Sequence, residues 1–227
     1  EIIKKCREEV GNDFAISIKM NSADFQKGGF SPEDSIQVAK LFSDSGIDNI
    51  EISGGTYEQP RLLGLDKVSI NPKRSESRKE STIAREAYFL SYAEEIAKVV
   101  NIPLMVTGGF RTKEGMEAAL ADGACEIVGV GRPLCANPYA IKELLAGQID
   151  ELPKYEKTLS IGPWWLSQTS PFRLIQAINA FSAQAWFYQQ IKKMGKGLMP
   201  DLNLKPWKAF REDAKADQEA IKEYQNF

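Results

Sequence analysis

Residues 102–133 read IPLMVTGGFRTKEGMEAALADGACEIVGVGRP. Two short apolar runs, 102–107 and 125–130, predict β-strands, and the amphipathic stretch 112–122 between them predicts a helix that ends at Gly123. A strand, a crossover helix and a second strand indicate parallel pairing in an α/β fold. Gly108 and Gly109 directly follow the first predicted strand, and Gly129 and Gly131 lie at the end of the second, where the backbone has unusual conformational freedom.

The same alternation of strand and helix continues on both sides of this stretch. Ser31 is a helix cap followed by Pro32, with Asp34 three residues after the cap, and Gly46 ends that helix. Its predicted buried face comprises Val38, Leu41 and Phe42. The other expected elements are strands 15–20 and 47–53, a polar loop at 54–81, and helices 84–100, 137–146, 174–194 and 206–224. Four β–α units fit either an open doubly wound sheet or part of a closed (β/α)8 barrel.

The composition excludes several classes of function. The chain has 227 residues, a formal net charge of −2 and no histidine. This balance predicts neither nucleic-acid nor membrane binding, and the lack of histidine excludes His-based catalysis and His metal sites. Three cysteines without a pairing motif favour a reducing compartment, so we expect a cytoplasmic location, with the cysteines buried as small hydrophobic residues.

The glycine-containing strand ends form a candidate anion site. TGGFR spans 107–111, and GVGRP spans 129–133. Glycines let main-chain N–H groups approach a phosphate, and loops after the last two strands of an eightfold barrel commonly bind one. The alternative is that these glycines serve only tight turns. A dinucleotide-binding fingerprint fits poorly, because Leu134 stands where the third glycine would be.

Lys19 is the second candidate site residue. In strand 15–20 it shares one face with polar neighbours, while Ile18 and Met20 lie on the other face. If the polar face points into a barrel, the lysine needs a partner of opposite charge. That partner is either Glu51 on the next strand, as a structural ion pair, or the electron-rich edge of a bound ligand.

Five runs together resemble the old yellow enzyme (NADH:flavin oxidoreductase) family of FMN-dependent TIM-barrel enzymes. They are SIKMNSADFQKGG (17–29), GIDNIEISGGTYEQP (46–60), IPLMVTGGFRT (102–112), ALADGACEIVGVGRPLCANP (119–138) and GPWWLSQTSPF (162–172). The resemblance implies that residues 1–172 form strands five to eight, the C-terminal half of the barrel, and that residues 173–227 form a C-terminal helical extension. The opening EIIKKCREEVG has the character of a helix end, which is consistent with a missing N-terminal half.

The resemblance also implies a cofactor and its contacts. Lys19 stands where the family has an arginine beside the flavin pyrimidine, so the charge is kept but the bidentate geometry is lost. The residues that correspond to the family's FMN-phosphate site are Gly108, Gly109, Phe110, Gly131 and Arg132. The family's substrate-binding and proton-donating residues lie on its first four strands and have no counterpart here, so no catalytic residue is assigned.

The implied activity is hydride transfer from NADH or NADPH, through FMN, to an activated alkene or a related small-molecule acceptor. This chain alone is expected to be inactive, and to need the missing half or to form a homo-oligomer. Two alternatives stay open: a phosphate-binding barrel enzyme without flavin, and a non-catalytic half-barrel. Tyr57 and Arg78 are expected to be solvated loop residues, and Tyr88 to pack within a helix. Because four strands leave two open edges, we expect the isolated chain to dimerise, aggregate or be marginally stable.

Overall fold

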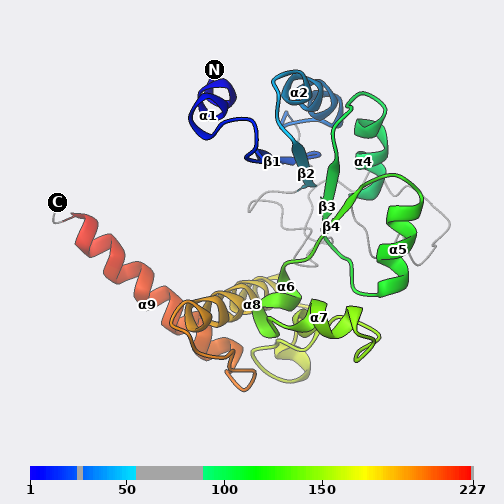
Figure 1. The fold of residues 1–227 in the computed structure, drawn as a ribbon. Helices are drawn as coiled ribbons and strands as arrows, with labels where there is room; N and C mark the ends of the chain where they lie inside the picture. Colours follow the sequence, from blue (N-terminus) through cyan, green and yellow to red (C-terminus); the bar gives the residue numbers. More distant parts are fainter. Residues whose placement is uncertain (25–27, 55–88, 226–227) are drawn as a thin grey trace. The chain divides into compact units, whose positions relative to one another are not determined.

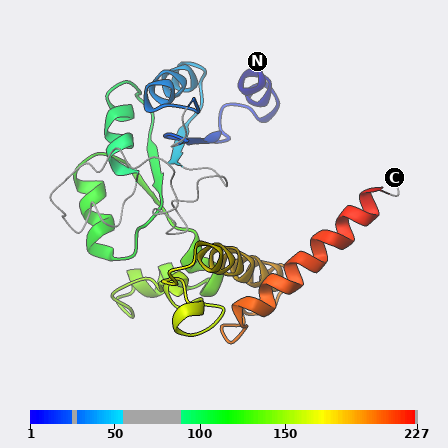
Figure 2. The same cartoon turned by 180° about the vertical axis from the view of Figure 1, so that it is seen from behind.

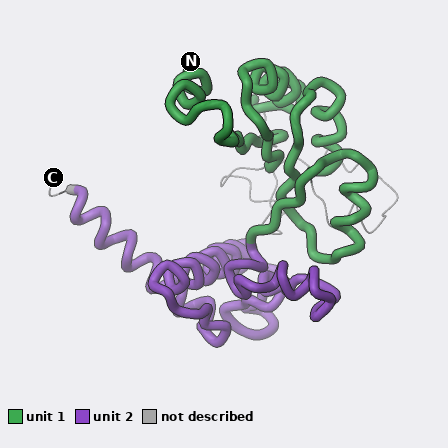
Figure 3. The backbone as a smooth tube through the Cα atoms, in the orientation of Figure 1, with its two compact units in different colours: residues 1–62, 69–131 green, residues 63–68, 132–227 purple. Residues whose placement is uncertain are grey.

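The computed structural model describes residues 1–24, 28–54 and 89–225. Tyr57, Arg78, Tyr88 and nearly all of the predicted loop at 54–81 lie outside these ranges. The described residues fall into two compact units, one ending at Gly131 and the other beginning at Arg132 (Figure 3). The predicted boundary between a half-barrel (1–172) and a helical extension (173–227) is a different division. The two compact units do not test it, so it stays a prediction.

The first unit is a parallel sheet with helices (Figure 1). Its elements are α1 (Ile2–Val10), β1 (Ser17–Asn21), α2 (Pro32–Asp44), β2 (Asn49–Ser53), α4 (Leu90–Ala97), β3 (Leu104–Thr107), α5 (Lys113–Ala121) and β4 (Ile127–Gly129). The strands lie side by side in the order β1-β2-β3-β4, and every neighbouring pair is parallel. The predicted α/β fold with a parallel sheet is therefore confirmed.

The helix boundaries follow the predicted capping residues. The Ser31 side chain accepts from the Asp34 main-chain N–H at 3.1 Å, and the Asp34 carboxylate accepts in return from the Ser31 N–H at 3.0 Å. Gly46 follows α2 with a φ of 83°, a conformation that suits glycine. The predicted burial of Leu41 is wrong, since 62% of it is exposed. Ser35 and Ala39 lie on the buried side of α2 instead.

One face of the sheet holds the core of the first unit. Ile50, Ile52 and Val106 are fully buried, and the helix residues Ala93 and Ile96 pack into the same cluster. Because side chains alternate along a strand, the polar residues between these positions project from the other face. The sequence period of two thus determines which residues can reach a ligand on the polar face.

The segment before β1 is held by Arg7 of α1. Its guanidinium donates to the main-chain oxygens of Gly11, Phe14 and Gly46 and to the Asp48 carboxylate at 2.5 Å. Asp48 also accepts from the Ile16 N–H at 2.7 Å. Arg7 therefore ties the chain entering β1 to the turn that precedes β2.

The second unit is helical. Its elements are α6 (Arg132–Ala136), α7 (Ala140–Leu145), the 3-10 turns η3 (Tyr155–Lys157) and η4 (Trp164–Leu166), α8 (Arg173–Met194) and α9 (Pro206–Gln225). Figure 2 shows α8 and α9 packed together, with the end of α9 extending past α8. The fully buried Trp186 of α8 donates through its indole N–H to the main-chain oxygen of Leu204 at 2.9 Å, which fastens the connection between the two helices.

Two sequence expectations about this region and the cysteines need correction. The helix predicted at about 137–146 corresponds to α7, which begins only at Ala140, and the separate short helix α6 precedes it. Pro138 lies in the break between α6 and α7, because proline disfavours helical conformation at the residue before it. The expectation of buried cysteines holds for Cys125, but Cys135 is only partly buried and Cys6 is exposed. Among the described residues, no helix is long and apolar enough to cross a membrane.

Candidate functional site

Lys19 and Glu51 lie opposite each other on the polar face of β1 and β2. Their side chains form an ion pair with an Nζ–Oε1 distance of 2.5 Å. The lysine side chain is 57% exposed, whereas the glutamate side chain is 19% exposed. The structural partner considered for Lys19 is thus present. The flavin contact stays a prediction, and the exposure of the lysine leaves its charge accessible on this face.

The carboxyl ends of β3 and β4 meet in register, with Thr107 opposite Gly129. A methyl group at Gly129 would lie 1.8 Å from the Thr107 hydroxyl oxygen and 2.8 Å from its Cβ. The threonine therefore fills the space that a side chain at position 129 would need. The parallel register places the starts of the two glycine turns at the same edge of the sheet.

The turn after β3 requires glycine at two successive positions. Gly108 has a φ of 140° and Gly109 a φ of 89°, both in the range that other residues rarely adopt. Phe110 is buried in the core, so only its main chain is available to a ligand. Thr112 then caps α5 by accepting from the Gly115 N–H at 3.1 Å. The turn therefore leads from a strand end directly into a helix N-terminus, an arrangement that favours anions.

Arg111 is a residue in this turn that sequence reasoning did not select. It is 6% exposed, and its Nη1 donates to the Phe110 main-chain oxygen at 2.7 Å. A buried guanidinium beside two glycines brings positive charge close to the candidate anion site. Its position directly after TGGF was the available sequence signal.

The second glycine turn is more open. A methyl group at Gly131 would meet no protein atom within 4 Å. Arg132 follows as the first residue of α6 and is partly buried. These two residues fall in different compact units, and their contribution to one phosphate site stays a prediction. Within the described ranges, no cluster of three or more Cys, Asp or Glu side chains could hold a metal ion.

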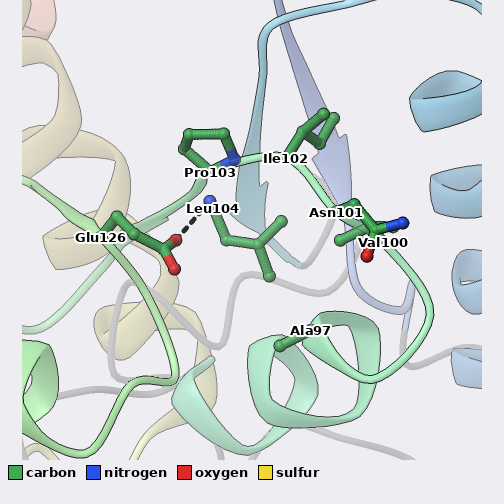
Figure 4. Close-up of a pocket in the computed structure, with 7 residues that line it drawn as sticks. All are labelled: Ala97, Val100, Asn101, Ile102, Pro103, Leu104 and Glu126. Carbon is green, nitrogen blue, oxygen red and sulfur yellow. Dashed lines mark hydrogen bonds between the residues drawn. The ribbon is translucent and has the colours of Figure 1, made fainter.

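A pocket of the first unit lies at the opposite ends of the strands (Figure 4). Its lining residues are Ala97, Val100, Asn101, Ile102, Pro103, Leu104 and Glu126. The Glu126 carboxylate accepts from the Leu104 N–H at 2.8 Å, which joins β3 to the segment before β4. Ligands of parallel α/β sheets bind at the carboxyl ends of the strands, so this pocket is separate from the candidate site.

Comparison with known proteins finds flavin oxidoreductases. The chain is 38% identical over 150 residues to the NADH-dependent flavin oxidoreductase iliE of Hypocrea jecorina, covering 64% of the chain and 34% of that protein. It is 30% identical over 200 residues to the NADH-dependent flavin oxidoreductase iccE of Talaromyces variabilis, covering 86% of the chain and 46% of that protein.

The chain belongs to the old-yellow-enzyme-like family of NADH:flavin oxidoreductases. A solved structure of 2-naphthoyl-CoA reductase with 2-naphthoyl-CoA is similar as well, with a TM-score of 0.52 and 26% identity over 66% of this chain and 21% of that one. No family model matches the chain. The chain spans about a third to a half of the length of the two curated relatives.

Proposed function

We propose that this chain contributes strands five to eight of an FMN-binding (β/α)8 barrel in an NAD(P)H-dependent oxidoreductase. The observation that carries the proposal is the pair of glycine turns after neighbouring parallel strands, the first of which needs glycine at positions 108 and 109. The names of the relatives support flavin and NADH. FMN as the flavin, NADPH as an alternative reductant and an activated alkene as acceptor are parts of the proposal.

The residues fit a phosphate group of this kind. Gly108, Gly109, Phe110 and Gly131 would offer main-chain N–H groups, and Arg132 would offer a charge-assisted hydrogen bond. The open space beside Gly131 supports this assignment, because a phosphate needs room close to the main chain. The phosphate contacts would hold the cofactor in position but would take no part in its chemistry.

Lys19 would supply positive charge beside the flavin ring. When bound, FMN would accept hydride from a reduced nicotinamide and pass it to the small-molecule acceptor. A cation that is still more than half exposed after pairing with Glu51 can also interact with a ligand over the polar face. The residues that bind the acceptor and donate its proton would lie outside this chain, which is why the chain alone should be inactive.

FMN and riboflavin differ only in the phosphate, so a comparison of their binding tests the proposed phosphate site directly. FMN fluorescence would be titrated with the purified chain, alone and together with a polypeptide that supplies the first four β–α units of a relative. We expect FMN to bind at least about tenfold more tightly than riboflavin, because one charge-assisted phosphate contact contributes about 1.5–3 kcal/mol.

Equal binding of FMN and riboflavin would refute the phosphate site. If inorganic phosphate bound as tightly as FMN, with no preference for the flavin ring, the chain would fit the alternative of a phosphate-binding barrel without flavin. No binding under either condition would favour the non-catalytic half-barrel.

A further inference from the structure

The outer side of α8 carries an apolar repeat. Leu174, Phe181 and Tyr188 are spaced seven residues apart and are 70%, 56% and 39% exposed. Ala177, Gln184 and Ile191 lie three residues after each of them. This is the a/d spacing of a coiled coil, with three a/d pairs between residues 174 and 191. We call these six residues the α8 seam: Leu174, Ala177, Phe181, Gln184, Tyr188 and Ile191.

The other side of α8 is already buried within its own unit. Ala183, Trp186 and Phe187 are all less than a tenth exposed. Apolar residues therefore lie on two sides of this helix. A helix of that composition is normally enclosed on both sides, so the exposed seam calls for a covering partner.

We propose that the α8 seam binds the α8 seam of a second copy of this chain in antiparallel orientation. Antiparallel pairing aligns each a position with a d position of the partner helix. Around a two-fold axis between residues 182 and 183, Tyr188 would face Ala177, Phe181 would face Gln184, and Leu174 would face Ile191. Each layer then combines a large side chain with a smaller or equal one, which fills space evenly.

Parallel pairing would fit less well. It would place Phe181 against Phe181 and Tyr188 against Tyr188, while Ala177 against Ala177 would leave a void. Layers with too much side-chain volume would then alternate with layers with too little, and both destabilise the packing of the two helices. The order of sizes along the seam therefore selects the antiparallel arrangement.

The charges at the helix ends are compatible with this arrangement. The seam itself carries none. Antiparallel pairing would bring Arg173 at the start of one helix near Lys192 at the end of the other. Lys192 is already neutralised by Asp213 of α9, with an Nζ–Oδ1 distance of 2.7 Å. The arginine would therefore meet a paired charge, not an isolated like charge.

The exposed apolar area of the seam is small for a dimer interface. Its large apolar side chains expose on the order of 400 Å² per copy, about half of the surface that each partner contributes in a standard interface. We therefore expect a weak, reversible dimer whose population changes with concentration in the micromolar range.

The test is sedimentation velocity of the whole chain over a range of concentrations. Phe181→Glu should weaken dimerisation by at least about tenfold, because it places a carboxylate in the central layer. Leu145→Glu, on the exposed face of α7, is the matched control and should leave dimerisation unchanged. Circular dichroism and a thermal melt verify that both variants are folded.

The orientation is tested by adding Gln184→Lys to Phe181→Glu. In the antiparallel pair the carboxylate introduced at position 181 would face the lysine introduced into the partner, and the double variant should regain most of the lost affinity. A monomeric wild-type chain at the highest concentration would overturn the proposal. Equal effects of the Phe181 and Leu145 variants would overturn it too, and failure of the double variant to recover would refute the antiparallel pairing.

Discussion

Replacement of Lys19 by methionine separates its structural role from its proposed role beside the flavin. The exposure of the Lys19 side chain limits how much its ion pair with Glu51 can contribute to stability. The Lys19–Glu51 pair is short, at 2.5 Å, but the lysine side chain is 57% exposed and solvent screens the pair. An ion pair exposed to this extent contributes at most about 1 kcal/mol. Lys19→Met should therefore lower the melting temperature by no more than about 2–4 °C.

The proposed role predicts a larger effect on the cofactor. A cation beside the flavin favours its reduced form, so removal of the charge should lower the midpoint potential of bound FMN. A two-electron couple moves by about 30 mV for 1.4 kcal/mol, and a charge-assisted contact of about 1.5–3 kcal/mol thus corresponds to roughly 30–60 mV. The assay is a spectroscopic redox titration of the FMN-loaded protein, with a thermal melt beside it.

Two control variants make the result specific. Lys19→Arg keeps the charge and should keep the potential within a few millivolts of wild type, while Glu51→Gln breaks the ion pair without removing the cation. An unchanged midpoint potential in Lys19→Met would refute the flavin role. A fall in melting temperature of about 2–4 °C with that result would show that the lysine acts only as the partner of Glu51.

Three further predictions concern the strand ends and the hydrogen bonds that Asp48 accepts before β2. Gly129→Ala should destabilise the chain by about 1–3 kcal/mol in chemical denaturation, because its methyl group would overlap the threonine side chain of the neighbouring strand; a neutral outcome would contradict the observed register. Arg132→Ala should weaken FMN binding by at least about tenfold in a fluorescence titration, and unchanged binding would remove it from the proposed site. Hydrogen bonds from the Ile16 N–H and then from Arg7 lower the pKa of Asp48, so its contribution to stability should be present above about pH 4 and be lost as the pH falls through the lowered value. Asp48→Asn should remove this part of the pH dependence, as followed by thermal melts from neutral to acid pH.

The strand alternation and helix caps could be read from the sequence because each depends on near neighbours. The Ser31–Asp34 capping box involves residues three apart, and its hydrogen bonds appear as predicted. The pairing of Lys19 with Glu51 follows from the alternation of side chains along two adjacent strands, which places both residues on the polar face. In both cases local spacing determines the contact.

The errors arose where the outcome depends on packing between distant segments. Leu41 has the spacing of a core residue, yet α2 packs through the smaller Ala39, and Leu41 stays in solvent. Cys6 lies on α1, which fully buries none of its residues. The α8 seam was missed for a related reason: a helix with apolar residues on two sides shows no clear periodicity, although its heptad spacing is visible in the sequence.

The glycine turns were interpreted either as tight turns or as an anion site. The backbone conformation shows that the two interpretations are compatible. A φ of 140° at Gly108 and of 89° at Gly109 turns the chain sharply between β3 and α5. The same conformation leaves no side chain over the main-chain N–H groups of the turn. Gly129 extends this logic to the next strand, since its missing side chain lets β4 approach Thr107. The requirement for glycine is therefore structural at Gly108, Gly109 and Gly129. Its consequence is a bare stretch of main chain at the strand ends, where a phosphate could bind.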